Sequence, residues 1–217
     1  MLTTLLTLSV AKALVAERFA PNAPSHRDML ASFIKHDLKQ EEASSEALLQ
    51  ILAGSDTSAT AIRVVFLHLI GNPVAYKRLV NEIDQAIATK SISSPIKDSE
   101  ARQMPYLQAV IKEGLRIIPP VPALFFKTVP TGGDVINGMF IPGDTDIGSS
   151  SFAIQRCAKT FGADVDVFRP ERWLEAEGGR LARMVSTVDM VFHYGKYQCL
   201  GKQVALMDFN KVFVEVS

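Results

Sequence analysis

Residues 40–120 carry the hydrophobic pattern of helices. From Ala47 to Ile70 apolar residues dominate and few polar residues mark a solvent face, so this segment predicts a mostly buried helix. Its start is placed at Gln40, because Glu41 and Glu42 would lie at the positive end of the helix dipole. Counted from there, at roughly 1.5 Å per residue, the helix would span about 45 Å and could cross a whole domain.

Two further helices are marked by their boundary residues. Asn72 predicts the N-cap of a helix whose Pro73 suits the first helical position and which runs to about Thr89. A serine-rich loop over residues 90–95 follows. The next helix is predicted over Pro105 to Ile117, because Pro119 and the residue before it prevent it from continuing.

The first sixteen residues are mildly apolar, but Thr, Ser and Lys12 interrupt them. The stretch is too short and too polar for a transmembrane helix, and it lacks the basic start and small-residue cleavage site of a signal peptide. It predicts an ordinary amphipathic helix.

After residue 121 the pattern changes to short apolar runs separated by Pro and Gly, over residues 121–128, 134–141 and 145–148. Asn137-Gly138 between two such runs predicts a hairpin. A helical turn is expected at 152–156, irregular chain at 164–171 and a flexible point at Gly178-Gly179. A last helix is expected to begin at about Cys199. The fold class is therefore mainly α with a small β-sheet, in a single domain over residues 1–217.

Composition limits the classes of function. The 217 residues include 23 Lys and Arg against 23 Asp and Glu, and 47% are hydrophobic. This apolar fraction allows a packed core and excludes general disorder. The zero formal charge argues against nucleic acid as a partner and against electrostatic anchoring to anionic membranes. Two cysteines cannot form a disulfide scaffold, and no C-x-x-C pair is present for zinc.

The most specific stretch for chemistry is residues 192–201, FHYGKYQCLG, which places Cys199 between Gly195 and Gly201. Glycines permit positive φ angles and close backbone approach to a bulky planar ligand. A cysteine thiolate at a helix N-terminus suits a soft metal or an iron porphyrin. The alternative is a buried structural cysteine, which the long irregular spacing Phe-x-x-Gly-x-x-x-Cys-x-Gly makes less attractive.

A polar notch, residues 53–57 (AGSDT), interrupts the long apolar helix. Thr57 can return its hydroxyl to the carbonyl group of Ala53, which weakens and bends a helix. One interpretation is a groove for a small ligand, in which Asp56 and Thr57 pass protons. The other is close packing of helices through small residues.

Glu113 and Arg116 are three residues apart and share a helix face. Taken alone, such a pair is more often a solvated ion pair. Arg172, in the segment FRPERW, could instead complete a buried network with them. The sequence alone leaves this choice open.

In order along the chain, the segments AGSDT, Glu113-Gly-Leu-Arg116, PERW and FHYGKYQCLG resemble the motifs of the cytochrome P-450 family of haem-thiolate monooxygenases. Residues 28–30 and 197–202 look most similar to its fungal, pisatin-demethylase-like branch. The resemblance covers nearly the whole chain and implies the C-terminal, haem-proximal half of that fold, truncated at both ends. Family members are anchored to the endoplasmic reticulum, and no anchor is recognised here.

The resemblance implies a role for each matching residue. Cys199 would be the proximal thiolate ligand of haem b, with Phe192 near the sulfur and Gly195 and Gly201 shaping the loop. Lys127 would pair with a haem propionate. Asp56 and Thr57 would line the oxygen groove and deliver protons, and Glu113, Arg116 and Arg172 would form a structural triad.

The chain departs from the family pattern at two loop positions. His193 stands where the family usually has Gly, which predicts a strained or altered backbone. We expect it to be an exposed loop residue rather than a rival ligand. Tyr197 stands where many members have an Arg that binds a propionate.

The function implied is oxidation of an apolar small molecule with O2, using electrons from a separate NADPH-cytochrome reductase, in fungal secondary metabolism. The alternative is a truncated, non-catalytic fragment or an incomplete gene model.

Overall fold

A computed structural model describes residues 2–24 and 26–216 and divides the chain into two compact units, Met1–Thr57 and Ser58–Ser217. The chain is mainly helical with two small antiparallel sheets, as the sequence predicted. Among the residues described, no single helix is long and apolar enough to cross a membrane. Helices α3 and α4 meet that test by length and composition only when they are taken together across a 108° bend.

An ion pair joins the first two helices of the first unit. Helix α1 (Leu2–Arg18) confirms the helix predicted at the start of the chain. Asp28 caps α2 (Met29–Lys35) by accepting a hydrogen bond from the Ala31 backbone N–H at 2.8 Å. Its carboxylate also accepts two hydrogen bonds from Arg18, the shorter at 2.7 Å. The Arg18 guanidinium and the Ala31 N–H together lower the pKa of Asp28 to about 2.

Helix α3 (Gln40–Ile70) has the predicted bounds, but the prediction that it is mostly buried is wrong for its middle. Residues 52–56 are all exposed, and a Cβ atom added to Gly54 would meet nothing within 4 Å. An apolar helix face is buried only where another element covers it, and no described element covers this stretch. The buried positions of α3 lie toward its two ends: Ala43 and Ser44 near the start, and Ala61, Val64, Val65 and Leu69 closer to the C-terminal end.

Helix α6 (Pro105–Ile117) lies at the centre of the second unit, and most of its side chains are buried. It packs against α4 (Pro73–Ala88), α9 (Arg172–Glu175), α10 (Gly178–Asp189) and α11 (Lys202–Glu215). Both α4 and α6 confirm the predicted ranges, and Asn72 caps α4 as expected. Gly114 is needed in α6 because a Cβ atom there would overlap Cγ2 of Val65.

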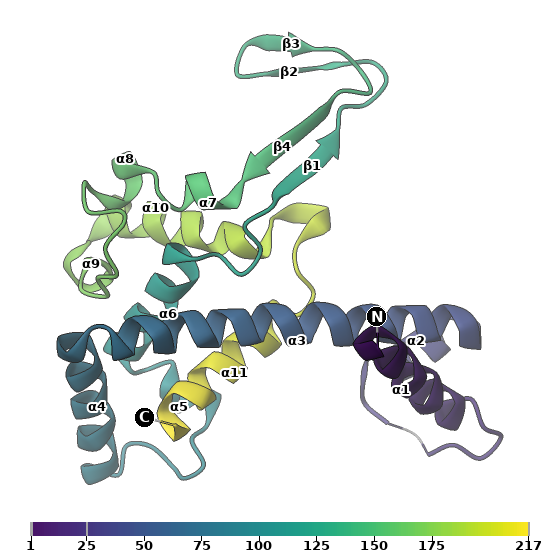
Figure 1. Cartoon of the computed structure of the whole chain (residues 1–217), viewed down its shortest axis with the longest axis horizontal. Helices are drawn as coiled ribbons and strands as arrows, with labels where there is room; N and C mark the ends of the chain where they lie inside the picture. Colours follow the sequence, from purple (N-terminus) through teal and green to yellow (C-terminus); the bar gives the residue numbers. More distant parts are fainter. Residues whose placement is uncertain (1, 25, 217) are drawn as a thin grey trace. The chain divides into compact units, whose positions relative to one another are not determined.

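The two sheets form an arm that extends from the helices of this unit (Figure 1). Strand β1 (Leu124–Thr128) pairs with β4 (Asp146–Ser150), with Lys127 opposite Ile147. Strand β2 (Asp134–Ile136) pairs with β3 (Met139–Ile141). Asn137 and Gly138 have φ values of 52° and 80°, which confirms the predicted hairpin turn.

Four short α-helices and two 3-10 helices complete the unit. The α-helices are α5 (Asp98–Ala101), α7 (Ser151–Ile154), α8 (Ala158–Phe161) and α9, and the 3-10 helices are η1 (Met190–Phe192) and η2 (Gly195–Tyr197). The sequence predicted only α7, and Gly178-Gly179, expected to be a flexible point, belongs to a helix. These glycines begin α10, because Met184 and Val188, four residues apart, bury one face of that helix. The last helix begins at Lys202 with Gly201 as its N-cap, so Cys199 lies in the turn before it.

Candidate functional site

Glu113 is the centre of a buried ionic network. Its carboxylate accepts hydrogen bonds from Arg116 at 2.8 and 3.0 Å and from Arg172 at 3.0 Å. It also accepts the Trp173 indole N–H at 2.9 Å and the Arg169 backbone N–H at 2.8 Å. All three charged side chains of the predicted triad have 0% exposure, so the interpretation of a solvated surface pair is wrong.

The two arginines of this network also bind backbone carbonyl groups of the irregular segment 155–167. Arg116 donates to the carbonyl oxygens of Gln155, Val165 and Val167 at 2.7–3.2 Å. Arg172 donates to those of Phe161, Asp164 and Val167 at 2.7–3.0 Å. Buried guanidinium groups that would otherwise lack partners are thereby satisfied.

The Asp164 carboxylate extends the network toward the surface. It accepts hydrogen bonds from Arg169 at 2.7 Å and from Arg172 at 3.0 Å. Partial burial acts to raise the pKa of Asp164, but the two guanidinium groups outweigh it and hold the pKa at about 2. The Asp164 carboxylate therefore stays ionised well into the acid range.

The loop that carries Cys199 is closed by backbone hydrogen bonds. The Cys199 N–H donates to the carbonyl oxygen of Phe192 at 2.8 Å, and the Gln198 N–H donates to that of Gly195 at 3.0 Å. Phe192 is buried, whereas Cys199 is exposed and Leu200 is 82% exposed. Gly195 has φ +66° and open space around it. The loop thus presents a thiol and apolar surface outward from a fixed backbone.

His193, within this loop, has φ 61° and ψ −175°, a conformation that favours glycine. The strained backbone predicted from the sequence is therefore present. The expectation of an exposed loop residue is wrong, because the half-buried imidazole ring packs edge-on against Phe125 with 3.8 Å between ring centroids. Burial, and to a smaller extent the charge of Lys127, lowers the pKa of His193, which favours the neutral ring.

Lys127 reaches the same loop from strand β1. Its Nζ atom lies 5.2 Å from the centroid of the Tyr197 ring, within the range of a cation–π contact. Both side chains are exposed. Lys127 therefore supplies a positive charge beside the loop that a ligand carboxylate could reach.

The described residues fit a haem better than a bare metal ion. They contain no group of three or more His, Cys, Asp or Glu side chains placed to hold a metal. A metal held by its own macrocycle needs only one protein ligand, and the exposed Cys199 thiol is of the soft type that haem iron accepts. Gly195, with open space around it, leaves room for a planar group against the loop.

Asp56 and Thr57 lie in the first unit. The Thr57 hydroxyl donates to the carbonyl oxygen of Ala53 at 2.8 Å, as predicted, and α3 continues through the notch without a break. Asp56 is exposed. No described helix packs against residues 53–56, so the alternative of close helix packing is not observed there.

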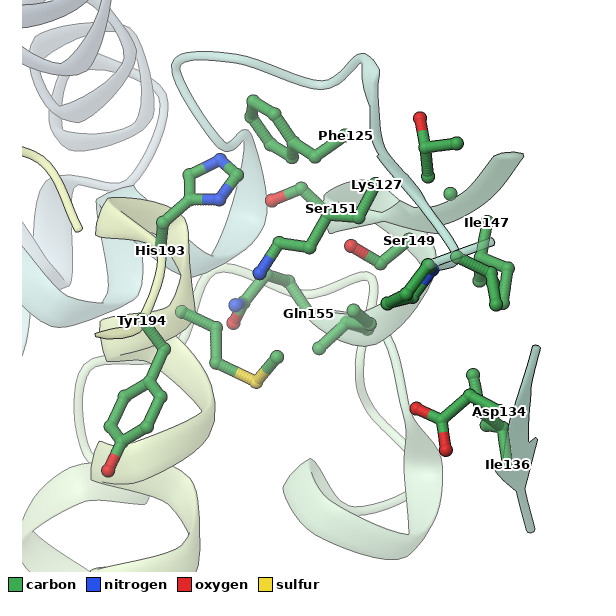
Figure 2. Close-up of a pocket in the computed structure, with 16 residues that line it drawn as sticks. Phe125, Lys127, Asp134, Ile136, Ile147, Ser149, Ser151, Gln155, His193 and Tyr194 are labelled. Carbon is green, nitrogen blue, oxygen red and sulfur yellow. The ribbon is translucent and has the colours of Figure 1, made fainter. Parts of the chain in front are cut away.

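A cavity of about 350 Å³ lies beside the Cys199 loop (Figure 2). Strands β1 and β4, helix α7 and residues 190–194 supply most of its lining. Gln155, fully buried, is also part of the lining. Sequence reasoning did not identify Gln155 or this cavity, because no motif or periodicity marks a single glutamine that tertiary contacts bury.

Comparison with known proteins agrees with the motifs. The family model for Cytochrome P450 matches residues 9–216. The chain is 47% identical over 206 residues to Cytochrome P450 monooxygenase ABA1 of Pyricularia oryzae, an alignment that covers 94% of this chain and 40% of that protein.

Two other fungal relatives are covered to a similar extent. The chain is 44% identical over 209 residues to Cytochrome P450 monooxygenase aba1 of Botryotinia fuckeliana, covering 96% of this chain and 41% of the relative. It is 36% identical over 197 residues to Cytochrome P450 monooxygenase cicH of Emericella nidulans, covering 88% and 39% respectively. The chain therefore spans about 40% of the length of the curated relatives it matches.

Proposed function

Because this chain belongs to the cytochrome P450 family, we propose that Cys199 supplies the thiolate ligand of a haem b in a monooxygenase. The observation that carries this proposal is the exposed Cys199 thiol on a loop that the Phe192 carbonyl holds closed. When bound, a haem-thiolate group activates O2 so that one oxygen atom can be inserted into an apolar substrate.

The other loop residues would orient and seat the planar group. Gly195 and Gly201 leave the backbone bare, so that a flat ligand can approach closely. The buried Phe192 ring would exclude water beneath the loop. Lys127 would pair with a propionate carboxylate, since its side chain is exposed. Tyr197, which faces Lys127 from the loop, is uncharged, so Lys127 would supply the positive charge here.

Asp56 and Thr57 would hold and pass protons. The Thr57 hydroxyl donates a hydrogen bond to the Ala53 carbonyl oxygen, so the lone pairs of Oγ1 can accept a hydrogen bond from water. The exposed Asp56 carboxylate can accept hydrogen bonds from water. Glu113, Arg116 and Arg172 would not touch the substrate and would act by fixing the surrounding backbone.

We further propose the partners of the whole enzyme. Electrons would come from a separate NADPH-cytochrome reductase, and the substrate would be an apolar small molecule of fungal secondary metabolism. The similarity to fungal monooxygenases over most of this chain supports this proposal.

The test is the spectrum of the reduced, carbon-monoxide-bound protein, expressed with haem available. We expect a red-shifted Soret band of the thiolate type that is lost in Cys199→Ser. Cys157→Ser is the matched control, because Cys157 is also exposed but lies outside the loop, and it should keep the band. Folded, soluble protein without haem, or a band that survives Cys199→Ser, would contradict the proposal.

A further inference from the structure

We propose that the cavity beside the Cys199 loop binds a neutral, mostly apolar alcohol or phenol whose hydroxyl group donates a hydrogen bond to Oε1 of Gln155. This site does not depend on haem. It follows from one buried acceptor without a partner and from the lining around it.

Gln155 is fixed from two directions. Its Nε2 donates to the carbonyl oxygen of Thr187 at 2.7 Å, and its own backbone carbonyl accepts from Arg116 at 3.1 Å. Because the Thr187 carbonyl can only accept, the amide nitrogen must face it, and the orientation of the amide group is settled. The oxygen is therefore the end of the amide that remains for a ligand.

Oε1 of Gln155 is buried and has no hydrogen-bond partner, although the residue has 0% exposure. A buried polar atom without a partner costs free energy, about 1–3 kcal/mol in typical cases. Gln155 lines the cavity, and Figure 2 shows its side chain among the other lining residues. A donor within the cavity would supply the missing partner.

The lining determines the rest of the ligand. Most of the exposed lining surface is apolar, and Ile147, Ile154 and Met190 are among the residues that form it. One lysine, Lys127, and one aspartate, Asp134, are also present, so their charges balance and a neutral ligand is favoured. The volume, about 350 Å³, lies at the small end of the usual range for small-molecule pockets. A bicyclic aromatic alcohol is of suitable size.

The experiment compares two probes of nearly the same shape, 2-naphthol and 2-methoxynaphthalene, by fluorescence titration of the full chain without haem. Only the first can donate a hydrogen bond. We expect 2-naphthol to bind about tenfold more tightly, in keeping with one buried hydrogen bond. Gln155→Met should remove this preference, because methionine keeps the length of the side chain without its acceptor.

A second variant locates the site without changing Gln155. Ile147→Phe should fill the cavity and weaken 2-naphthol binding at least tenfold. Val135→Phe is the control, because this substitution adds the same ring to the hairpin outside the cavity. Val135 does not line the cavity, although its neighbours Asp134 and Ile136 do. Circular dichroism would show whether each variant is folded. If Gln155→Met does not fold, the comparison of the two probes on the wild-type chain and the Ile147→Phe variant still test the proposal.

Three results would overturn the proposal. Equal affinities of the wild-type chain for the two probes would show that Oε1 is satisfied by water alone. Equal weakening by Ile147→Phe and Val135→Phe would place the probe elsewhere. Complete displacement of 2-naphthol by added haem would show that the cavity belongs to the haem site, whatever the outcome of the spectral test of Cys199.

Discussion

His193 combines a backbone conformation suited to glycine with a side chain that has found a packing partner. The strain in such a conformation is typically about 1–3 kcal/mol. An edge-on aromatic contact such as the one with Phe125 offsets about 0.5–1.5 kcal/mol. The folded protein therefore loses stability at this position, and the loss is caused by the Cβ atom rather than by the imidazole ring.

His193→Gly should therefore be more stable than His193→Ala by about 1 kcal/mol, since both lose the ring but only alanine keeps the Cβ atom. Urea unfolding of the two variants measures the difference. At Tyr194, where φ is −142°, the order should reverse, because glycine there brings only its entropic cost. Alanine more stable than glycine at both positions would contradict the assignment of strain to His193.

Glu113 balances two buried guanidinium groups with one carboxylate. Glu113→Gln keeps the shape of the side chain but leaves Arg116 without a counter-charge and Arg172 with only the Asp164 carboxylate. Removal of one partner from a buried ion pair typically costs about 3–5 kcal/mol. We expect a loss of that size in the free energy of unfolding, measured by denaturant titration.

Glu175→Gln is the matched control for this variant. Glu175 pairs with Arg169 at 2.6 Å, but its side chain is 59% exposed, so its loss should cost less than about 1 kcal/mol. Similar costs for the two variants would show that the buried network does not contribute more than an exposed ion pair.

At this scale, the sequence identifies residues whose neighbours along the chain define their chemistry. The glycines and aromatic residues around Cys199 mark it directly. The buried network of Glu113, Arg116 and Arg172 was only one of two interpretations, the other being a solvated ion pair. The sequence could not decide between them because Glu113 and Arg172 are 59 positions apart. Gln155 could not be predicted, since its importance comes only from the tertiary contacts that bury it.

Among the elements, α6 and the last part of α3 depend on close approach. Gly114 brings the α6 backbone next to Val65, and any Cβ atom there would overlap a β-branched side chain with few rotamers. Gly114→Ala should therefore destabilise the second unit by about 1–3 kcal/mol, as overpacking does elsewhere. Thermal or urea unfolding measures this cost.

A double-mutant cycle makes this prediction specific. Val65→Ala removes the overlapping methyl groups, so Gly114→Ala should cost at least about 1 kcal/mol less in that background. Strict additivity of the two substitutions would show that the glycine is required for another reason.

The elements that the sequence predicted well are those with local signals. Helices α3, α4 and α6 are bounded by Glu, Asn and Pro residues and carry long apolar patterns. Helices α8 and α9 were missed because each is only four residues long. They also depend on a tertiary contact, since Arg172 in α9 donates to the carbonyl oxygen of Phe161, the last residue of α8. The exposed middle of α3 could not be predicted either, because burial depends on which elements cover a face.

For the molecule as a whole, exposed apolar surface is the main liability. At the corner between α3 and α4, Leu67, Ile70 and Val74 are 64%, 78% and 77% exposed. Exposed apolar side chains gathered at one place favour non-specific association. We expect the chain to associate increasingly with concentration, as light scattering after size exclusion would measure.

Substituting Ile70→Lys and Val74→Lys should reduce this association. Asn81→Lys, on the exposed side of α4, adds positive charge without removing apolar surface and is the control. If it reduces association as much as the first two, then net charge rather than the corner is responsible.

The arginines of the network have one more consequence, which concerns evolution. They bind carbonyl groups, which every residue type possesses, at fixed points between residues 155 and 167. Most side chains of that segment can therefore drift without disturbing the arrangement. An inserted or deleted residue would move the carbonyl groups away from their donors. Relatives should accordingly differ in composition here while keeping the number of residues constant.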